Sequence, residues 1–181
     1  RWAAAEDLDF TMLPGGMRTS HNCHDIQWSF DKKGYWVPAG GGLGNQLNFF
    51  DAAAGERMKD IGFEDITQDI NHAQFVSEDG GAYLSSRLTS AVLKVNASTG
   101  GIDWVAGGAD GTYTVYHLDG TVYGPGDFPF NGQHNAEYFG ENELFMVDNQ
   151  YEETRPTFYR VYAIDEVAET LTEVWNYAYA A

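Results

Sequence analysis

Three similar two-strand segments constrain the fold of this chain more than any other feature of its sequence. They begin at His24, His72 and His134, and each continues as two short runs of apolar residues that alternate with polar ones across a turn. In the second segment, a run at 71–76 is followed by an Asp-Gly-Gly turn and a run at 82–87. Alternation with a period of two is typical of β-strands, and its recurrence predicts a fold built from repeated β-units.

Each segment extends into a unit of four predicted strands. The predicted strands lie near 24–29, 35–39, 46–50 and 56–60; 73–77, 82–86, 91–95 and 101–105; and 135–139, 144–148, 158–164 and 171–177. Four short strands in about 40 residues match one blade of a β-propeller. We therefore predict an all-β protein, a single partial β-propeller domain over residues 1–181. Its three four-stranded blades are expected at about 21–62, 69–108 and 131–178.

A long connection at 107–132 separates the second unit from the third. It is rich in Gly, Asp and Tyr and contains two Asp-Gly turns. Connections of this length are either functional loops or surface excursions, and the sequence leaves both open.

Three blades leave open sheet edges, which soluble proteins normally cover. We expect either further blades or a partner chain that completes the propeller. The sequence begins at Arg1 without a methionine and carries no signal-like segment, so we expect a processed chain or a piece of a longer one.

Charge and cysteine content exclude several classes of function. Lys and Arg number 10 against 27 Asp and Glu, and the formal charge is −17, whereas nucleic acids and anionic membranes bind cationic faces. No apolar run approaches the roughly 20 residues of a membrane span. The single cysteine, Cys23, cannot form an internal disulfide. We expect no nucleic-acid partner and no membrane insertion, and an acidic surface of this kind suggests an extracellular, periplasmic or secretory-pathway protein.

The recurring histidines are the main candidates for chemistry. In a propeller the first strand of each blade lines the central channel, so three imidazoles would converge there, and Arg87 ends a second strand at the same rim. Such a set would form a cationic pocket suited to a sulfate or phosphate ester. The alternatives are histidines held by backbone hydrogen bonds and an arginine in a surface ion pair.

Metal and nucleotide motifs are weak. The run His21-Asn22-Cys23-His24 lacks the spacing of a zinc site, and the glycine-rich 40–44 lacks the lysine and hydroxyl of a phosphate loop. We expect no metal and no cofactor.

Several runs resemble the arylsulfotransferase family, the PAPS-independent aryl sulfate transferases, which are six-bladed β-propellers. The runs are Asp69–His72, Leu84–Val95, Thr99–Trp104 with Gly107-Gly108, and Gln133–Ala136. The resemblance extends over about 20–178 and implies part of a six-bladed ring. It also implies transfer of a sulfuryl group from an aryl sulfate to a phenol without PAPS.

The resemblance implies roles for four residues. His134 matches the histidine that is transiently sulfated, His72 and Arg87 match residues that hold the sulfuryl oxygens, and His24 resembles a further pocket histidine. A neutral imidazole can attack sulfur, which divides one difficult transfer into two easier ones. The alternatives are a non-catalytic propeller used for binding or assembly, and a different propeller enzyme such as a hydrolase or lyase.

Overall fold

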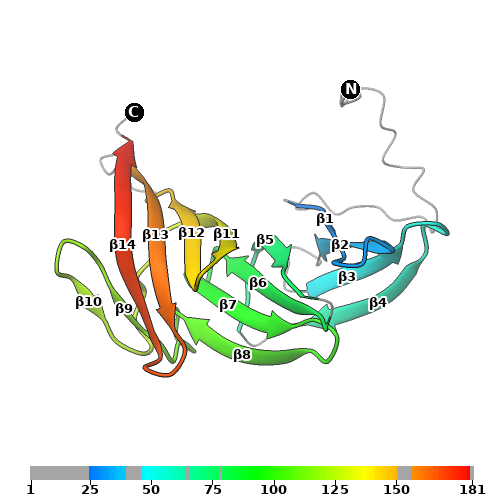
Figure 1. Cartoon of the computed structure of the whole chain (residues 1–181), viewed down its shortest axis with the longest axis horizontal. Coiled ribbons are helices and arrows are strands. Elements are labelled where there is room, and N and C mark those ends of the chain that lie inside the picture. The colour runs from blue at the N-terminus through cyan, green and yellow to red at the C-terminus, as the bar shows by residue number, and fades with distance from the viewer. Residues whose placement is uncertain (1–24, 40–45, 64–65, 78, 151–155, 180–181) are drawn as a thin grey trace.

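The computed structural model describes residues 25–39, 46–63, 66–77, 79–150 and 156–179. Within these ranges the chain forms strands and turns without an α-helix, and no helix is long and apolar enough to cross a membrane. The strands form three sheets that follow one another in chain order, side by side (Figure 1). The all-β prediction is confirmed.

The first two sheets each contain four antiparallel strands in sequential order. The first consists of β1 (Gln27–Trp28), β2 (Gly34–Ala39), β3 (Gln46–Asp51) and β4 (Arg57–Gly62). The second consists of β5 (Ile70–Phe75), β6 (Gly81–Ser86), β7 (Ala91–Asn96) and β8 (Gly101–Ala106). Sequential antiparallel order in four-stranded units is the arrangement of propeller blades.

The third sheet has the same four-strand unit and an added hairpin. Its unit is β11 (Gln133–Gly140), β12 (Glu143–Asp148), β13 (Thr157–Asp165) and β14 (Thr170–Tyr179). From the long connection, β9 (Thr114–Tyr116) pairs in parallel with β14, and β10 (Val122–Tyr123) pairs with β9. The connection therefore widens the third sheet to six strands instead of forming an unstructured excursion.

The turn after the third strand of each unit is built in the same way. The strands β3, β7 and β13 end at Asp51, Asn96 and Asp165, and the side-chain oxygen of each accepts the backbone N–H groups two and three residues further on. Side chains of Asp and Asn close turns through such bonds. This recurrence confirms that the three units are structural repeats.

The sheets pack face to face, and the second is buried on both faces. On its strands Leu84 and Leu93 join a core with the first sheet, whereas Tyr83 and Val92 join a core with the third. Because successive side chains of a strand point to opposite faces, adjacent residues supply two different cores.

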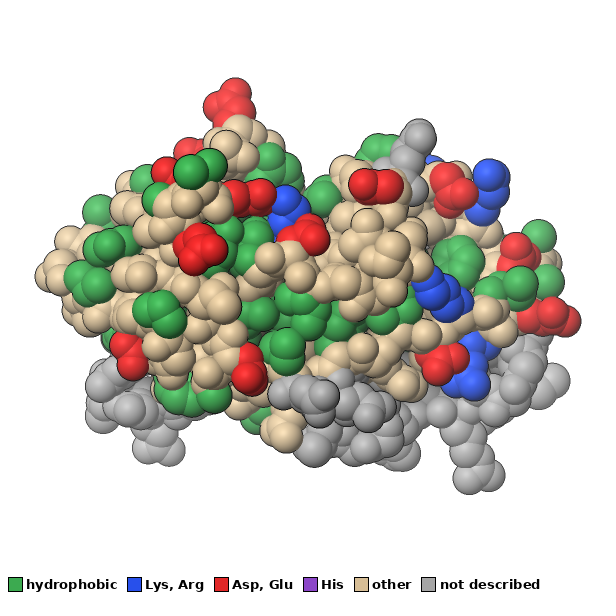
Figure 2. Space-filling model, turned by 90° about the horizontal axis from the view of Figure 1, so that it is seen from below, with side chains coloured by type: hydrophobic (Ala, Val, Ile, Leu, Met, Phe, Trp, Pro, Cys, Tyr) green, Lys and Arg blue, Asp and Glu red, His purple; other side chains and the backbone are tan. Residues whose placement is uncertain are grey.

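The third sheet exposes aromatic residues on its other face. Trp104 within β8 is 5% exposed, whereas Trp175 at the corresponding place in β14 is 49% exposed and shares its sheet with the exposed Tyr159 and Tyr177. Trp175 packs less than its position in the repeat predicts, since the described residues form no fourth sheet that covers it. Figure 2 shows acidic side chains scattered over the face seen from below and hydrophobic ones gathered across its middle.

Candidate functional site

The candidate site is built on the inner strands β1, β5 and β11, the first strands of the three sheets. Hydrogen bonds from side chains join β5 to β11: Asn71 Nδ2 donates to Gln133 O at 2.8 Å, and the Gln74 amide makes two bonds with the Tyr138 backbone. His72 lies on β5 and His134 on β11, so the structure places these two predicted residues on adjoining strands.

His72 is buried between two carboxylates. Its Nδ1 lies 2.9 Å from Asp25 Oδ2, and its Nε2 lies 3.3 Å from Glu137 Oε1. Asp25 precedes β1 and Glu137 belongs to β11, so one imidazole links all three sheets. Among the described residues, Nε2 makes no hydrogen bond, so the 3.3 Å approach of Glu137 is an ion-pair contact only.

The pKa of Asp25 reflects this contact. Burial acts to raise the pKa of Asp25, but the hydrogen bond and charge of His72, together with hydrogen bonds from Gln27 and the Ala73 backbone, outweigh it, so the pKa lies below its ordinary value of 3.8. Asp25 therefore remains a carboxylate at neutral pH and fixes one side of the His72 ring.

Arg87 lies in the turn after β6 and pairs with a buried carboxylate. Its Nη2 contacts Asp69 Oδ2, and its backbone N–H donates to Asp69 O at 3.0 Å. Among the residues that the structure describes, the buried Nε of Arg87 has no hydrogen-bond partner. A buried guanidinium N–H without a partner is costly, so this group is a donor that an anion would satisfy.

His134 is half-buried at the start of β11. Its Nδ1 lies 2.9 Å from Gly132 O and 3.0 Å from the Asn149 amide nitrogen. Both contacts cannot be ordinary hydrogen bonds of one tautomer. A carbonyl oxygen can only accept, so Nδ1 carries the hydrogen. The Asn149 amide therefore turns its oxygen, not its nitrogen, toward the ring.

The two histidines occupy equivalent positions of the cross-strand register, because His72 lies opposite Ser85 and His134 opposite Val147, the fifth residues of β6 and β12. His72 directly precedes the buried Ala73, whereas Asn135, with φ of 51°, is inserted as a bulge before the buried Ala136. The register of β5 is irregular just before His72, whereas that of β11 is irregular just after His134. A bulge redirects a side chain, which explains why His72 is enclosed and His134 remains partly accessible.

Carboxylates accompany two of the four residues of the expected cationic pocket. His72 faces Asp25 and Glu137, and Arg87 faces Asp69, whereas His134 contacts a backbone carbonyl and an amide. The fourth predicted residue, His24, lies outside the described residues, as do His21 and Cys23. Among the described residues, no group of His, Cys, Asp and Glu side chains forms a metal site.

The sequence analysis missed the residues that hold the predicted ones in place. These are Asp25, Asp69, Glu137 and Asn149. A usable signal was present for three of them, because Asp25 and Glu137 belong to the repeated inner-strand segments and Asn149 occupies the Arg87 position of the third unit.

Three consecutive four-stranded antiparallel units define a β-propeller architecture, and solved structures agree. The chain resembles the periplasmic gluconolactonase PpgL of Pseudomonas aeruginosa (TM-score 0.51, 14% identity, 86% of this chain and 40% of that one). It also resembles a putative 6-phosphogluconolactonase of Bacteroides fragilis (0.50, 16%, 86% and 41%) and the WD40 repeats of RRP9 (0.50, 10%, 91% and 40%). At these identities the likeness shows the fold alone, and the chain spans about two fifths of each structure.

The sequence identifies the family within this architecture. The family model described as Arylsulfotransferase (ASST) matches residues 54–180, and the chain belongs to this family. The match includes the positions of His72, Arg87 and His134, and the predicted resemblance is confirmed. A search of curated proteins found no match.

Proposed function

We propose that this chain contributes to a site that moves a sulfuryl group from an aryl sulfate to a phenol through a sulfohistidine at His134. Membership of the arylsulfotransferase family supports the general activity. The finer assignment rests on the arrangement of side chains on the inner strands.

The contact between His134 Nδ1 and Gly132 O is the observation that carries the proposal. At 2.9 Å it keeps hydrogen on Nδ1, so in the neutral imidazole the lone pair lies on Nε2. A nucleophilic histidine needs one nitrogen with a lone pair and a second group that fixes the ring. Here a backbone carbonyl supplies that second group.

The reaction has two balanced steps. In the first, the lone pair on His134 Nε2 attacks sulfur, an N–S bond forms, the S–O bond to the aryl group breaks, and the aryl oxygen leaves as a phenolate that takes up a proton. In the second, the oxygen of a phenol attacks sulfur, the S–N bond breaks, and the phenol proton is released. The donor supplies the sulfuryl group directly, so the scheme uses neither PAPS nor a metal.

Arg87 is the proposed binding group for the sulfuryl oxygens. Its Nε–H has no partner among the described residues, while its Nη2 is tied to Asp69. An ionised donor makes stronger hydrogen bonds to an oxyanion than a neutral one. The pair with Asp69 also fixes the orientation of the guanidinium.

His72 offers Nε2 to a sulfuryl oxygen in this scheme, because this buried nitrogen makes no hydrogen bond among the described residues. The Glu137 side chain is 40% exposed and lies 3.3 Å from Nε2, so it can turn into solvent, whereas the contact with Asp25 is shorter and more buried. We therefore assign Nε2 of His72 to the oxygens and Nδ1 to Asp25.

A non-catalytic propeller used for binding or assembly is the second candidate, and one observation favours it. Both ring nitrogens of the buried His72 face carboxylates from the neighbouring sheets, which is the arrangement of a structural histidine. In this alternative the same residues hold the blades together and no group is transferred.

A labelled donor distinguishes the two candidates. The full chain is incubated with 4-nitrophenyl [35S]sulfate, and we expect nitrophenol release and radiolabel on the denatured protein that acid removes. His134→Ala is expected to lose both signals while keeping the circular dichroism of the wild type. Absence of release by the wild type, or equal labelling of His134→Ala, would refute His134 as the sulfated residue.

A further inference from the structure

The turn between β7 and β8 contains an Asn-Ala-Ser sequence at 96–98. Asn96 is the only asparagine of the chain that is followed two positions later by serine or threonine. Asn-X-Ser, where X is not proline, is the acceptor sequence for N-linked glycans in secreted proteins. Because so short a sequence also arises by chance, the structure of the turn has to show whether the reacting groups are available.

Asn96 closes the turn with only one of its two polar side-chain atoms. Its Oδ1 accepts the backbone N–H of Ser98 at 2.9 Å and that of Thr99 at 3.1 Å. Its Nδ2, the atom to which a glycan is attached, makes no hydrogen bond to any described residue and is not enclosed. The fold therefore uses the amide oxygen and leaves the amide nitrogen to solvent.

The hydroxyl of Ser98 is unused as well. The neighbouring Thr99 hydroxyl donates to Asn96 O at 3.5 Å and accepts the backbone N–H of Gly101 at 3.1 Å. Ser98 is exposed, and its hydroxyl forms no hydrogen bond within the part of the chain that the structure describes. The turn thus depends on Thr99 and on the amide oxygen of Asn96, but not on the Ser98 side chain.

The other two units show that this turn needs neither asparagine nor serine. Asp51 and Asp165 take the place of the asparagine and accept the same two backbone bonds. Ala53 and Val167 take the place of the serine. The second unit therefore differs from the others at both positions of the acceptor sequence, and turn formation explains neither difference.

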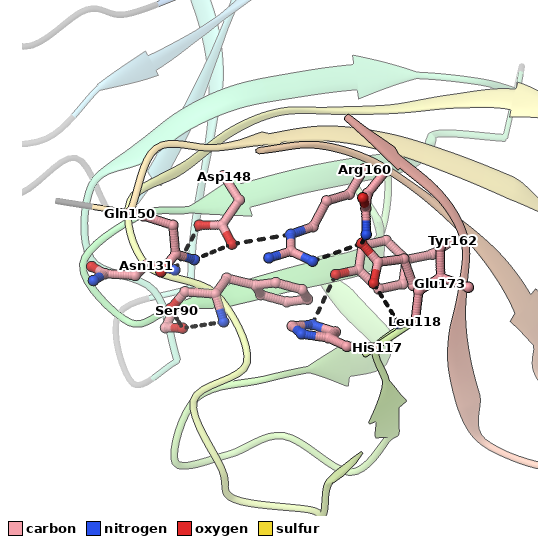
Figure 3. A network of polar contacts seen from close by, with 11 residues as sticks. Ser90, His117, Leu118, Asn131, Asp148, Gln150, Arg160, Tyr162 and Glu173 are labelled. Carbon is pink, nitrogen blue, oxygen red and sulfur yellow. Dashed lines mark hydrogen bonds and ion pairs between the residues drawn. The ribbon is translucent and has the colours of Figure 1, made fainter. Parts of the chain in front are cut away.

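A buried polar network elsewhere in the fold shows the opposite situation. Arg160 lies between two carboxylates, with Nε 3.3 Å from Asp148 and Nη1 2.6 Å from Glu173, as Figure 3 shows. Buried polar groups need partners of this kind, whereas exposed ones do not. The exposed atoms Asn96 Nδ2 and Ser98 Oγ remain open to an enzyme that modifies the chain.

We propose that Asn96 is the acceptor of an N-linked glycan. The donor is an oligosaccharide carried on a lipid diphosphate, and the Ser98 hydroxyl is the second group that the transferring enzyme recognises. Nδ2 attacks the anomeric carbon of the first sugar, a C–N bond forms and the C–O bond to the diphosphate breaks. The diphosphate leaves, and Nδ2 gives up one of its two hydrogens as a proton.

A glycan at this position leaves the candidate site open. Asn96 lies opposite Gly81 at one end of the β6–β7 pair, and Ala91 lies opposite Ser86 at the other end, next to Arg87. Five steps along an extended strand span about 17 Å. The sugar would therefore extend from the end of the blade that lies away from Arg87, and the proposal does not depend on sulfuryl transfer.

Secretion of the full chain from mammalian cells behind a cleavable leader tests the acceptor. Mass spectrometry is expected to find one glycan, on the peptide that contains Asn96, and peptide N-glycosidase F should remove it. Ser98→Ala should abolish the modification, and Ser98→Thr should keep it. Asn96→Asp should also abolish it but retain the circular dichroism of the wild type, because aspartate closes the turns of the other two units.

Each outcome decides for or against the site. The protein retained in the cells is analysed together with the secreted protein, so that poor export does not hide the glycan. An unmodified wild type, in cells that glycosylate a secreted reference protein, overturns the assignment, as does a glycan that persists in Ser98→Ala. A protein that carries the glycan but transfers no sulfuryl group supports the acceptor site and refutes only the proposed function.

Discussion

Replacement of Arg160 by methionine is expected to destabilise the protein by about 3–5 kcal/mol, because it leaves two buried carboxylates without their counterion. The side chains of Arg160, Asp148 and Glu173 are 7%, 0% and 1% exposed. Burial already raises the pKa of Asp148 against the opposing effects of Asn131 and Arg160, so loss of the guanidinium removes part of what keeps this carboxyl ionised. Methionine has a similar length and preserves the packing of the stem.

A surface pair with the same contact distance provides the control. Lys94 Nζ lies 2.6 Å from Glu166 Oε1, as Arg160 Nη1 does from Glu173, but the two side chains are 26% and 48% exposed. Lys94→Met is therefore expected to cost no more than about 1 kcal/mol.

Urea unfolding followed by tryptophan fluorescence measures both changes. The free energy of unfolding in water should fall by several kcal/mol in Arg160→Met and scarcely change in Lys94→Met. Adding Asp148→Asn and Glu173→Gln to Arg160→Met should restore part of the loss, because the uncompensated charges disappear. Equal small losses in the two single variants would refute the reasoning that burial, and not distance, sets the cost.

Three further predictions concern the blades and their contacts. Since the folded-state pKa of Asp25 lies below 3.8, its pairing with His72 contributes stability that is present above about pH 4 and is lost as pH falls through the folded value. Asp25→Asn should therefore be less stable than the wild type at pH 7, and the difference should shrink in acid. Urea titrations at several pH values would show this. Leu84→Ala should lower the free energy of unfolding by about 2–5 kcal/mol, because Leu84 is fully buried. Leu88→Ala is the control and should lower it by well under 1 kcal/mol, because Leu88 is 54% exposed. Similar losses in the two variants would contradict the packing of the first two sheets. Gly107 has φ of 78°, and a Cβ there would lie 2.4 Å from a backbone oxygen, so Gly107→Ala should lower the melting temperature by several degrees; an unchanged melting temperature would refute this close approach.

The repeat of the strands was predictable from sequence because it depends on local properties. Alternating apolar residues fix which side chains enter the cores, and Asp51, Asn96 and Asp165 fix the turns through bonds to their own neighbours. Such signals extend over a few residues and remain visible in a single sequence.

The partners of the predicted site residues depend on longer-range packing. Asp25 meets His72 across 47 positions of the chain, and Glu137 reaches the same ring from 65 positions away. The register is irregular before His72 in β5 but after His134 in β11, and no residue pattern in this single chain announces this difference. The hairpin β9–β10 escaped prediction for a related reason, since its pairing partner β14 lies more than 50 residues further along the chain.

The structural and functional interpretations of His72 need not exclude each other. Asp25 lies just before β1, whereas His72 and Glu137 belong to the second and third sheets, and each contact holds only while the sheets keep their packing. The Asp25 contact is short and enclosed, whereas Glu137 is partly exposed, so the first secures the ring and the second is the one that a competing sulfuryl oxygen would displace. A histidine that joins the blades on one side can therefore present its other nitrogen to an anion, and the geometry of the site depends directly on the packing of the blades.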